Sequence, residues 1–91
     1  MNELMLGDYG LPVIFPVTRN GVPYDLSGHT VTLIFTKPSG AIVGKTGSGA
    51  GHIASYTIDE GLVDERGWWT VTMAVSKEGL RLHGQRRFRV I

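Results

Sequence analysis

Apolar and polar residues alternate along two segments of this chain, Thr30–Lys37 and Trp68–Val75. The apolar positions are Val31, Leu33 and Phe35 in the first segment and Trp69, Val71, Met73 and Val75 in the second. A period of two buries one face of a β-strand and leaves the other face towards solvent. We therefore predict that both segments are strands and that these side chains form the centre of the core.

Weaker alternation marks five further strands. These are Leu11–Thr18, Ala41–Lys45, His52–Ile58, Leu80–His83 and Arg86–Ile91. Pro12 and Pro16 each remove a backbone N–H donor, which favours an edge position for the first of these strands. The last strand is predicted to turn Phe88 and Val90 inward and its arginines outward.

Thirteen glycines and four prolines divide the 91 residues into short segments, as is typical of all-β proteins. Asn20-Gly21 tolerates positive φ and predicts a hairpin turn. Thr46–Gly51 is too poor in side chains to pack and is predicted to be a mobile hairpin tip. Asp59–Arg66 is predicted to be a polar connection with room for one helical turn. About seven short strands at this spacing predict an all-β fold, an immunoglobulin-like antiparallel β-sandwich.

The length of the chain allows one domain, residues 1–91, with residues 1–6 as a candidate flexible N-terminal arm. A hydrophobic content of 42% is sufficient for a packed core. There is no cysteine, which excludes disulfides and thiolate metal sites and fits folding in a reducing cytoplasm.

A net charge of +1 lacks the basic excess typical of nucleic-acid binders. No apolar run approaches the roughly 20 residues that a membrane-spanning helix needs. The N-terminal residues lack the basic and apolar regions of a signal peptide. We therefore expect no nucleic-acid partner, no membrane partner and no secretion signal.

Glycine-rich motifs for phosphate binding fail on spacing. Gly44-Lys45-Thr46 resembles the end of a phosphate-binding loop, but only three residues separate Gly40 from Gly44 where four are needed. Gly47–Gly51 also misses the dinucleotide fingerprint, because His52 occupies the position of its last glycine. We expect no cofactor.

The titratable residues show no catalytic or metal-binding pattern. The three histidines, His29, His52 and His83, share no local ligand spacing. The acidic residues Asp59, Glu60, Asp64 and Glu65 lack the regular spacing of a calcium loop. We interpret them as solvated loop charges, open to a basic neighbour. The expectation is a protein with no metal site and no catalytic residue, and therefore not an enzyme.

Trp68 is predicted to point away from the core, because adjacent strand residues face opposite sides of a sheet. Two interpretations stay open: partial cover by a neighbouring arginine through a cation–π contact, or a hot spot for a partner. Four arginines near the C-terminus predict a basic strip that suits an acidic partner. The candidate partner-binding residues are Trp68, Thr70, Arg81, Arg86, Arg87 and Arg89.

Residues 20–28 read Asn-Gly-Val-Pro-Tyr-Asp-Leu-Ser-Gly, followed by Thr30-Val31-Thr32 and Lys37-Pro38-Ser39-Gly40. This corner, strand and turn resemble the immunoglobulin-like domain at the start of phage baseplate upper proteins and in related phage tail modules. The resemblance extends from Gly7-Asp8 to Ile91. It includes Arg66-Gly67-Trp68-Trp69, where the family has proline first and tyrosine last.

The resemblance implies a bacteriophage virion structural protein with no enzymatic residues to carry over. The helical region that follows this domain in the baseplate upper proteins has no counterpart here, so we expect a free-standing version. We expect it to be assembled in the host cytoplasm and to dock on other virion proteins of a symmetric tail or baseplate. One alternative is a capsid decoration (cement) protein on the phage head. Another is a glycan-binding adhesion module, in which Trp68 and Tyr9 or Tyr24 stack on host sugars.

Overall fold

The computed structural model describes residues 3–91, and these residues contain β-strands and no helix. In chain order the strands are β1 (Glu3–Leu4), β2 (Pro12–Pro16), β3 (Thr18–Arg19), β4 (Val22–Pro23), β5 (Thr30–Thr36), β6 (Ile42–Thr46), β7 (Ser48–Ala50), β8 (Ile53–Thr57), β9 (Gly67–Lys77) and β10 (Leu80–Val90). The all-β prediction is confirmed. The described residues form ten strands rather than about seven, and β9 and β10 are each eleven residues long.

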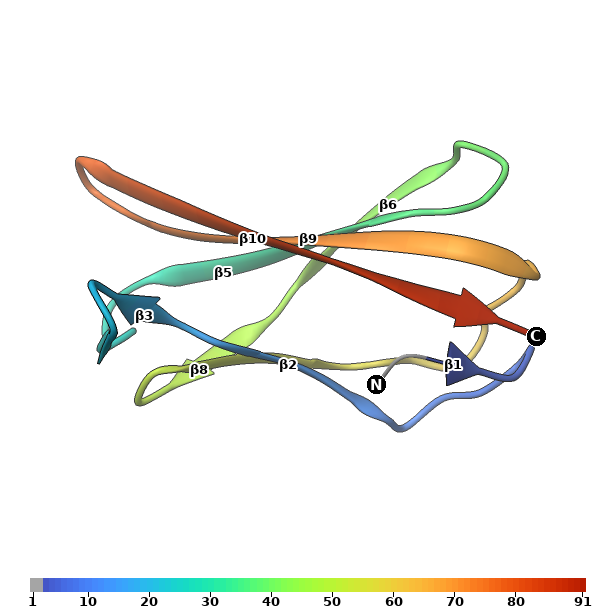
Figure 1. Cartoon of the computed structure of the whole chain (residues 1–91), viewed down its shortest axis with the longest axis horizontal. Coiled ribbons are helices and arrows are strands. Elements are labelled where there is room, and N and C mark those ends of the chain that lie inside the picture. Colours follow the sequence, from blue (N-terminus) through green and yellow to red (C-terminus); the bar gives the residue numbers. More distant parts are fainter. Residues whose placement is uncertain (1–2) are drawn as a thin grey trace.

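The strands form two packed layers (Figure 1). One layer is a five-stranded sheet in the order β1-β10-β9-β5-β6, and the other is a three-stranded sheet in the order β2-β8-β7. Strands β3 and β4 make a separate small hairpin. All pairings are antiparallel except β1 with β10, which is parallel, so the five-stranded sheet is mixed and the predicted wholly antiparallel sandwich is wrong at this pair. The fold is β-sandwich-like.

The core lies between the layers and contains the residues that the alternation predicts. Buried side chains from the five-stranded sheet include Val31, Leu33, Phe35, Trp69, Val71, Met73, Val75, Phe88 and Val90. The three-stranded sheet contributes Val13, Phe15 and Ala54. The centre is aromatic: the ring of Trp69 stacks on Phe88 at 5.6 Å between centroids, and Phe88 meets Phe35 edge-on.

Two local predictions from proline and glycine are confirmed. β2 is an edge strand that pairs only with β8, so the missing N–H groups of Pro12 and Pro16 leave no gap in a central ladder. Asn20 and Gly21 both have positive φ, 54° and 78°, and they connect β3 to β4. This left-handed backbone is the conformation that a two-residue hairpin turn needs.

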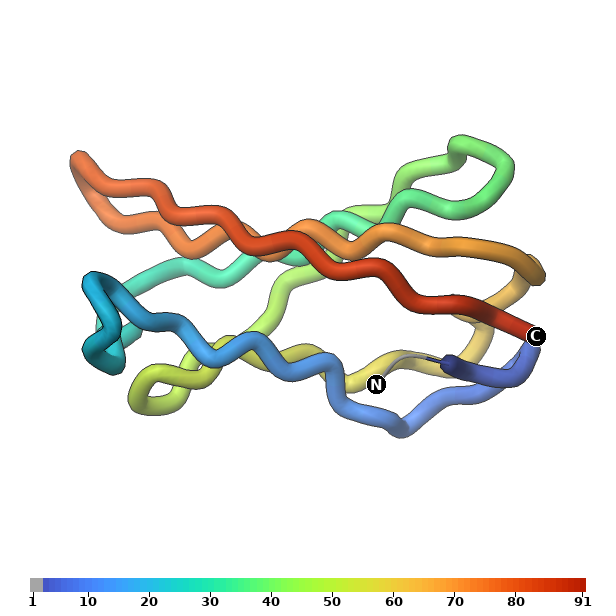
Figure 2. The backbone as a smooth tube through the Cα atoms, viewed as in Figure 1, coloured from blue at the N-terminus to red at the C-terminus, as the bar shows by residue number. Residues whose placement is uncertain are grey.

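The segment Thr46–Gly51 is not the mobile hairpin tip predicted from its composition. Its residues 48–50 form β7, and the chain passes there from the five-stranded sheet to the three-stranded sheet (Figure 2). Gly47 sits at this crossing, where a Cβ would lie 2.6 Å from Leu33 Cδ1 and 2.7 Å from the Ser55 carbonyl oxygen. Glycine is needed here for close backbone approach, so the absence of side chains is a packing requirement.

Two other predictions for the C-terminal half are also wrong. Leu80–His83 and Arg86–Ile91 are not separate strands, because β10 runs without a break through Gly84 and pairs with β9 along its whole length. Residues 59–66 contain no helical turn, and Leu62 and Val63 in this loop are buried in the core. Most of the residues around Leu62 and Val63 are charged, so the sequence pattern gave no sign that these two side chains are buried.

The start of the chain is tied to its end. Of the candidate arm, residues 1–2 lie outside the described residues, while Glu3–Leu4 form β1 beside the C-terminal end of β10 (Figure 1). Leu4 is only 3% exposed and belongs to the core cluster. The N–H of Ile91 donates to the Leu4 carbonyl at 2.8 Å, so residues 3–4 are part of the sheet rather than an arm.

Candidate partner-binding surface

Five of the six predicted site residues lie together on one face of the five-stranded sheet. We call this the outer face, the side of that sheet away from the core. β9 and β10 pair in register, with Trp68 opposite Arg89 and Thr70 opposite Arg87. Arg81 lies further along the same row of β10, opposite Ser76. Paired residues of an antiparallel ladder point to the same side, so these side chains share one surface.

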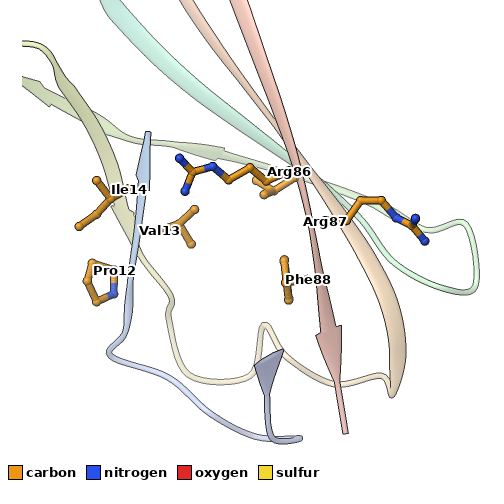
Figure 3. Close-up of a pocket in the computed structure, with 7 residues that line it drawn as sticks. Pro12, Val13, Ile14, Arg86, Arg87 and Phe88 are labelled. Carbon is orange, nitrogen blue, oxygen red and sulfur yellow. The ribbon is translucent and has the colours of Figure 1, made fainter. Parts of the chain in front are cut away.

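Arg86 does not belong to this surface, and the prediction of one strip of four arginines is wrong for it. Side chains alternate along β10, so Arg86 falls in the same row as the buried Phe88 and Val90. Its side chain extends towards β2, whereas Arg87 points the opposite way (Figure 3). The guanidinium lies over the ring of Phe15, 4.8 Å from the centroid. Arg86 therefore covers the seam between the two layers.

Trp68 and Trp69 have the opposite environments that strand alternation predicts. Trp69 is fully buried, and its indole Nε1–H donates to the Glu65 carbonyl at 3.0 Å. Trp68 is 53% exposed on the outer face. The guanidinium of Arg87 lies 4.8 Å from the Trp68 ring centroid. The arginine cover, one of the two interpretations left open for Trp68, is present, and about half of the residue still faces solvent.

Hydroxyl groups fill the middle of the outer face. Across β5 and β9, Thr36 is paired with Thr70, Ile34 with Thr72, and Thr30 with Ser76. Gln85 on β10 donates from Nε2 to the Thr72 hydroxyl at 3.2 Å. Ile42 of β6 lies at the far edge and is 69% exposed. The surface thus combines an aromatic ring, hydroxyls and arginines, and of these the aromatic residue and the arginines are types enriched at protein interfaces.

Charge is distributed unevenly between this face and the rest of the molecule. The outer rows of β9 and β10 carry three arginines and no carboxylate. Glu3, at the end of the sheet, is an acidic residue in register with Arg89. A surface of one sign attracts a partner of the opposite sign and steers its approach.

Three of the four carboxylates in the acidic loop have partners in this chain, and two of these partners are lysines, the kind of basic neighbour that the interpretation of this loop left open. Asp64 forms a salt bridge with Lys37 at 2.9 Å, and Asp59 forms one with Lys45 at 3.2 Å. Glu65 accepts from the hydroxyl of Ser39 at 2.9 Å and from its backbone N–H at 3.1 Å. These contacts hold residues 59–65 against the β5–β6 hairpin.

Asp59 also accepts a hydrogen bond from the Tyr56 hydroxyl. This bond, with help from Lys45, holds the pKa of Asp59 below its ordinary value. Desolvation raises the pKa of Tyr56 to about 12, and the Asp59 carboxylate adds to the rise. The contacts of Asp59 with Lys45 and Tyr56 link β6 to the end of β8.

The corner motif at residues 25–28 has a clear structural role. The Asp25 carboxylate accepts from the Ser27 N–H at 3.0 Å and from the Ser27 hydroxyl at 2.8 Å, and these bonds lower the pKa of Asp25. The turn buries Leu26, whose N–H donates to the Gly51 carbonyl at 2.8 Å. The motif therefore anchors the start of β5 to the three-stranded layer.

The histidines lie apart, and within residues 3–91 no three His, Cys, Asp or Glu residues are grouped to hold a metal ion. His29 Nε2 is 3.1 Å from the Tyr24 hydroxyl, and His83 accepts from Arg81 Nε at 3.0 Å on the outer face. No segment in this part of the chain forms a helix able to cross a bilayer.

Sequence reasoning missed a second surface, two hollows along the seam between β2 and β10. The smaller, of about 110 Å³, is lined by Pro12, Val13, Ile14, Val71, Arg86, Arg87 and Phe88 (Figure 3). The larger, of about 230 Å³, is lined by Phe15, Pro16, Val17, Thr18, Met73, Leu82, His83 and Gly84. The sequence predicted that Gly84 lies between two separate strands, and it therefore gave no indication of a hollow at this position.

The described residues define an all-β, β-sandwich-like protein. The chain matches no protein-family model, no curated protein and no solved structure.

Proposed function

We propose that this protein is a bacteriophage virion structural protein, an immunoglobulin-like docking module assembled on the tail or baseplate. Two observations support the proposal. The motifs at residues 20–28 and 37–40 resemble the domain at the start of phage baseplate upper proteins. The layers and the core arrangement are those of a β-sandwich, the architecture to which immunoglobulin-like domains belong.

The observation that carries the docking role is the outer face. Trp68 is half-exposed and stacks with Arg87. Two further arginines, Arg81 and Arg89, lie in the same row of β10. Threonines lie between these residues and the exposed Ile42. Trp and Arg are the residues most enriched at interface hot spots. The face belongs largely to β9 and β10, the longest strands of the fold, so the backbone that carries these side chains is held by a continuous ladder. It would bind an acidic patch on a repeated virion subunit as a rigid surface.

A capsid position remains the alternative within the same class, because the same face would suit a decoration protein on the phage head. The partner's location, rather than the chemistry of the contact, separates the two. Half-exposed Trp68 also supports an adhesion module that binds host glycans. The exposed part of Trp68 would stack on a sugar.

The test is cosedimentation of the purified protein with phage particles assembled from a genome that lacks its gene. We expect saturable binding, and we expect Trp68→Ala and Arg87→Glu each to weaken it at least tenfold, as is usual for hot spots. Arg19→Glu is the matched control, since it makes the same charge change on an exposed residue of β3. It should bind as the unmodified protein does.

The copy number at saturation then assigns the position. A small multiple of three or six per particle indicates the tail or baseplate, and hundreds of copies indicate the capsid. Absence of saturable binding, or equal binding by all three variants, would overturn the docking proposal. Binding to a glycan array that is lost in Trp68→Ala, without binding to particles, would favour the adhesion module instead.

A further inference from the structure

The edge of β10 is unpaired over most of its length. β10 pairs with β9 throughout, but β1 covers only Arg89 and Val90 (Figure 1). The N–H of Ile91 points towards β1, where it donates to Leu4. Because backbone groups alternate in direction along a strand, those of Arg81, His83 and Gln85 point towards the same edge. No residue between 3 and 91 pairs with them there.

The larger hollow lies directly beside this free edge. Its floor is Phe15 and Met73, and its wall on β10 is Leu82 to Gly84. Gly84 stands in the inward row, in line with Leu82 and Phe88, and it has no side chain to fill the space. A Cβ there would lie 3.6 Å from both Phe15 and Met73, at ordinary contact distance, and φ is not positive. The backbone does not require glycine at this position, and its effect is to keep the hollow open.

β1 shows what this edge accepts. Glu3 and Leu4 pair in parallel with Arg89 and Val90, and the Leu4 side chain turns inward between the layers, where it is buried. A strand added further along β10 would turn every second side chain inward in the same way. Those side chains would enter the hollow beside Gly84 and then the smaller one beside Phe88 (Figure 3).

The charges along this edge define the rest of the partner. Arg81 and Arg87 stand in the outer row of β10, Arg86 covers the seam over Phe15, and neither hollow has a carboxylate in its lining. A second copy of this edge is a poor partner. Antiparallel pairing of two copies about Gly84 or Gln85 would set Arg81 opposite Arg87 or Arg89, and like charges directly opposite destabilise a sheet.

We propose that the free edge of β10 binds an extended segment of a partner protein by β-strand addition. The segment is apolar at alternate positions, which fill the hollows, and carries carboxylates at the positions between them. Main-chain hydrogen bonds to Arg81, His83 and Gln85 would hold it, and the hollows would select its side chains. This site shares Arg81 and Arg87 with the outer face, but it also needs the unpaired backbone of β10 and the hollow at Gly84, which the docking proposal does not use. Variants at Trp68 and at Gly84 therefore test the two proposals separately.

The probe is the capped peptide Thr-Val-Glu-Leu-Glu-Val-Thr, added to the isotope-labelled protein and followed by NMR. We expect the amides of Arg81, His83 and Gln85 to shift and to exchange with solvent at least tenfold more slowly. The same peptide with lysine in place of glutamate should bind at least tenfold more weakly. A peptide N-methylated at alternate residues loses the donors that face β10 and should not bind.

Gly84→Val tests the hollow without damaging the fold. Its side chain fills the space beside Phe15 and Met73, so peptide affinity should fall at least tenfold while the melting temperature stays equal or rises. Gly44→Val is the matched control on β6, where a Cβ has no neighbour within 4 Å. It should bind the peptide as the unmodified protein does, as should Trp68→Ala.

Three outcomes would overturn the proposal. The first is no change at the β10 amides at any peptide concentration reached. The second is equal binding of the glutamate and lysine peptides, or unchanged binding in Gly84→Val. The third is concentration-dependent protection of β10 in the protein alone, with a dimer in analytical ultracentrifugation, which would assign the edge to self-association.

Discussion

Gly47 is a single residue that allows the chain to cross from one layer of the sandwich to the other. It lies between β6 and β7, where the chain leaves one layer for the other and passes against Leu33 and the backbone of Ser55. The backbone oxygen cannot move aside as a flexible side chain could. The position therefore tolerates only a hydrogen atom.

Gly47→Ala is expected to lower the free energy of unfolding by about 1–3 kcal/mol, the usual cost of forcing a methyl group into a packed core. Urea unfolding measures this change. Gly44→Ala, three residues earlier and with free space around its Cβ, is the control and should change stability by less than about 0.5 kcal/mol. Equal stability of both variants would contradict the close approach at Gly47.

Side-chain contacts join strands of different sheets, in addition to the backbone hydrogen bonds within each sheet. Lys45 on β6, Tyr56 on β8 and Asp59 after β8 form one linked group across the two layers. The hydrogen bond from Tyr56 lowers the pKa of Asp59 in the folded protein. The ionised Asp59 therefore stabilises the fold above pH 3.8, and this contribution is lost as the pH falls through the lower pKa of the folded state. For Tyr56 the pKa is raised from 10.0 to about 12, so its contribution is present below pH 10 and is lost as pH rises towards 12.

Asp59→Asn removes the charge that both shifts share. Near neutral pH we expect it to lower the free energy of unfolding by no more than about 1 kcal/mol, because the group is partly exposed. Urea unfolding across pH should show the difference shrink well below pH 3.8, where the wild-type carboxylate is also protonated. A difference that stays constant through the acid range would show that the effect is not electrostatic.

At the scale of the whole molecule, the two ends of the chain close one side of the core together. β1 lies against the C-terminal end of β10, and the Leu4 side chain is buried there in register with Val90. The outer face and the β10 edge are therefore parts of a sheet whose last strand is held at one end by the N-terminal segment. If both proposals hold, one sheet would contact two neighbours, one at its outer face and one at the edge of β10.

Leu4→Ala is expected to lower the free energy of unfolding by about 2–3 kcal/mol, towards the low end for a buried leucine because the site is at a sheet edge. Thermal or urea unfolding measures this loss. Met5→Ala is the control, since Met5 is 63% exposed, and it should be within about 0.5 kcal/mol of wild type. If the two variants are equally stable, β1 does not contribute to the core.

Strand positions with strong alternation could be predicted from the sequence because burial there repeats every two residues. Phe35, Trp69 and Val75 were placed inward, and Trp68 outward, by parity alone. Five of the six candidate contact residues were brought onto one face for the same reason. Arg86 was placed wrongly, because it was grouped with the other arginines by charge although it shares the parity of the inward Phe88 and Val90.

What the sequence determined by itself is the local geometry: which residues alternate, where Asn20-Gly21 turns the chain, and why Pro12 and Pro16 belong at an edge. What only the tertiary structure decided is long-range pairing: the strand formed by residues 48–50, the burial of Leu62 and Val63, the union of β1 with β10, and the hollow at Gly84. The physical reason is that periodicity and backbone preference act between near neighbours in the chain. Packing between layers depends on segments that are far apart in the sequence. The sequence alone also does not distinguish a glycine that permits close backbone approach from one that permits a turn.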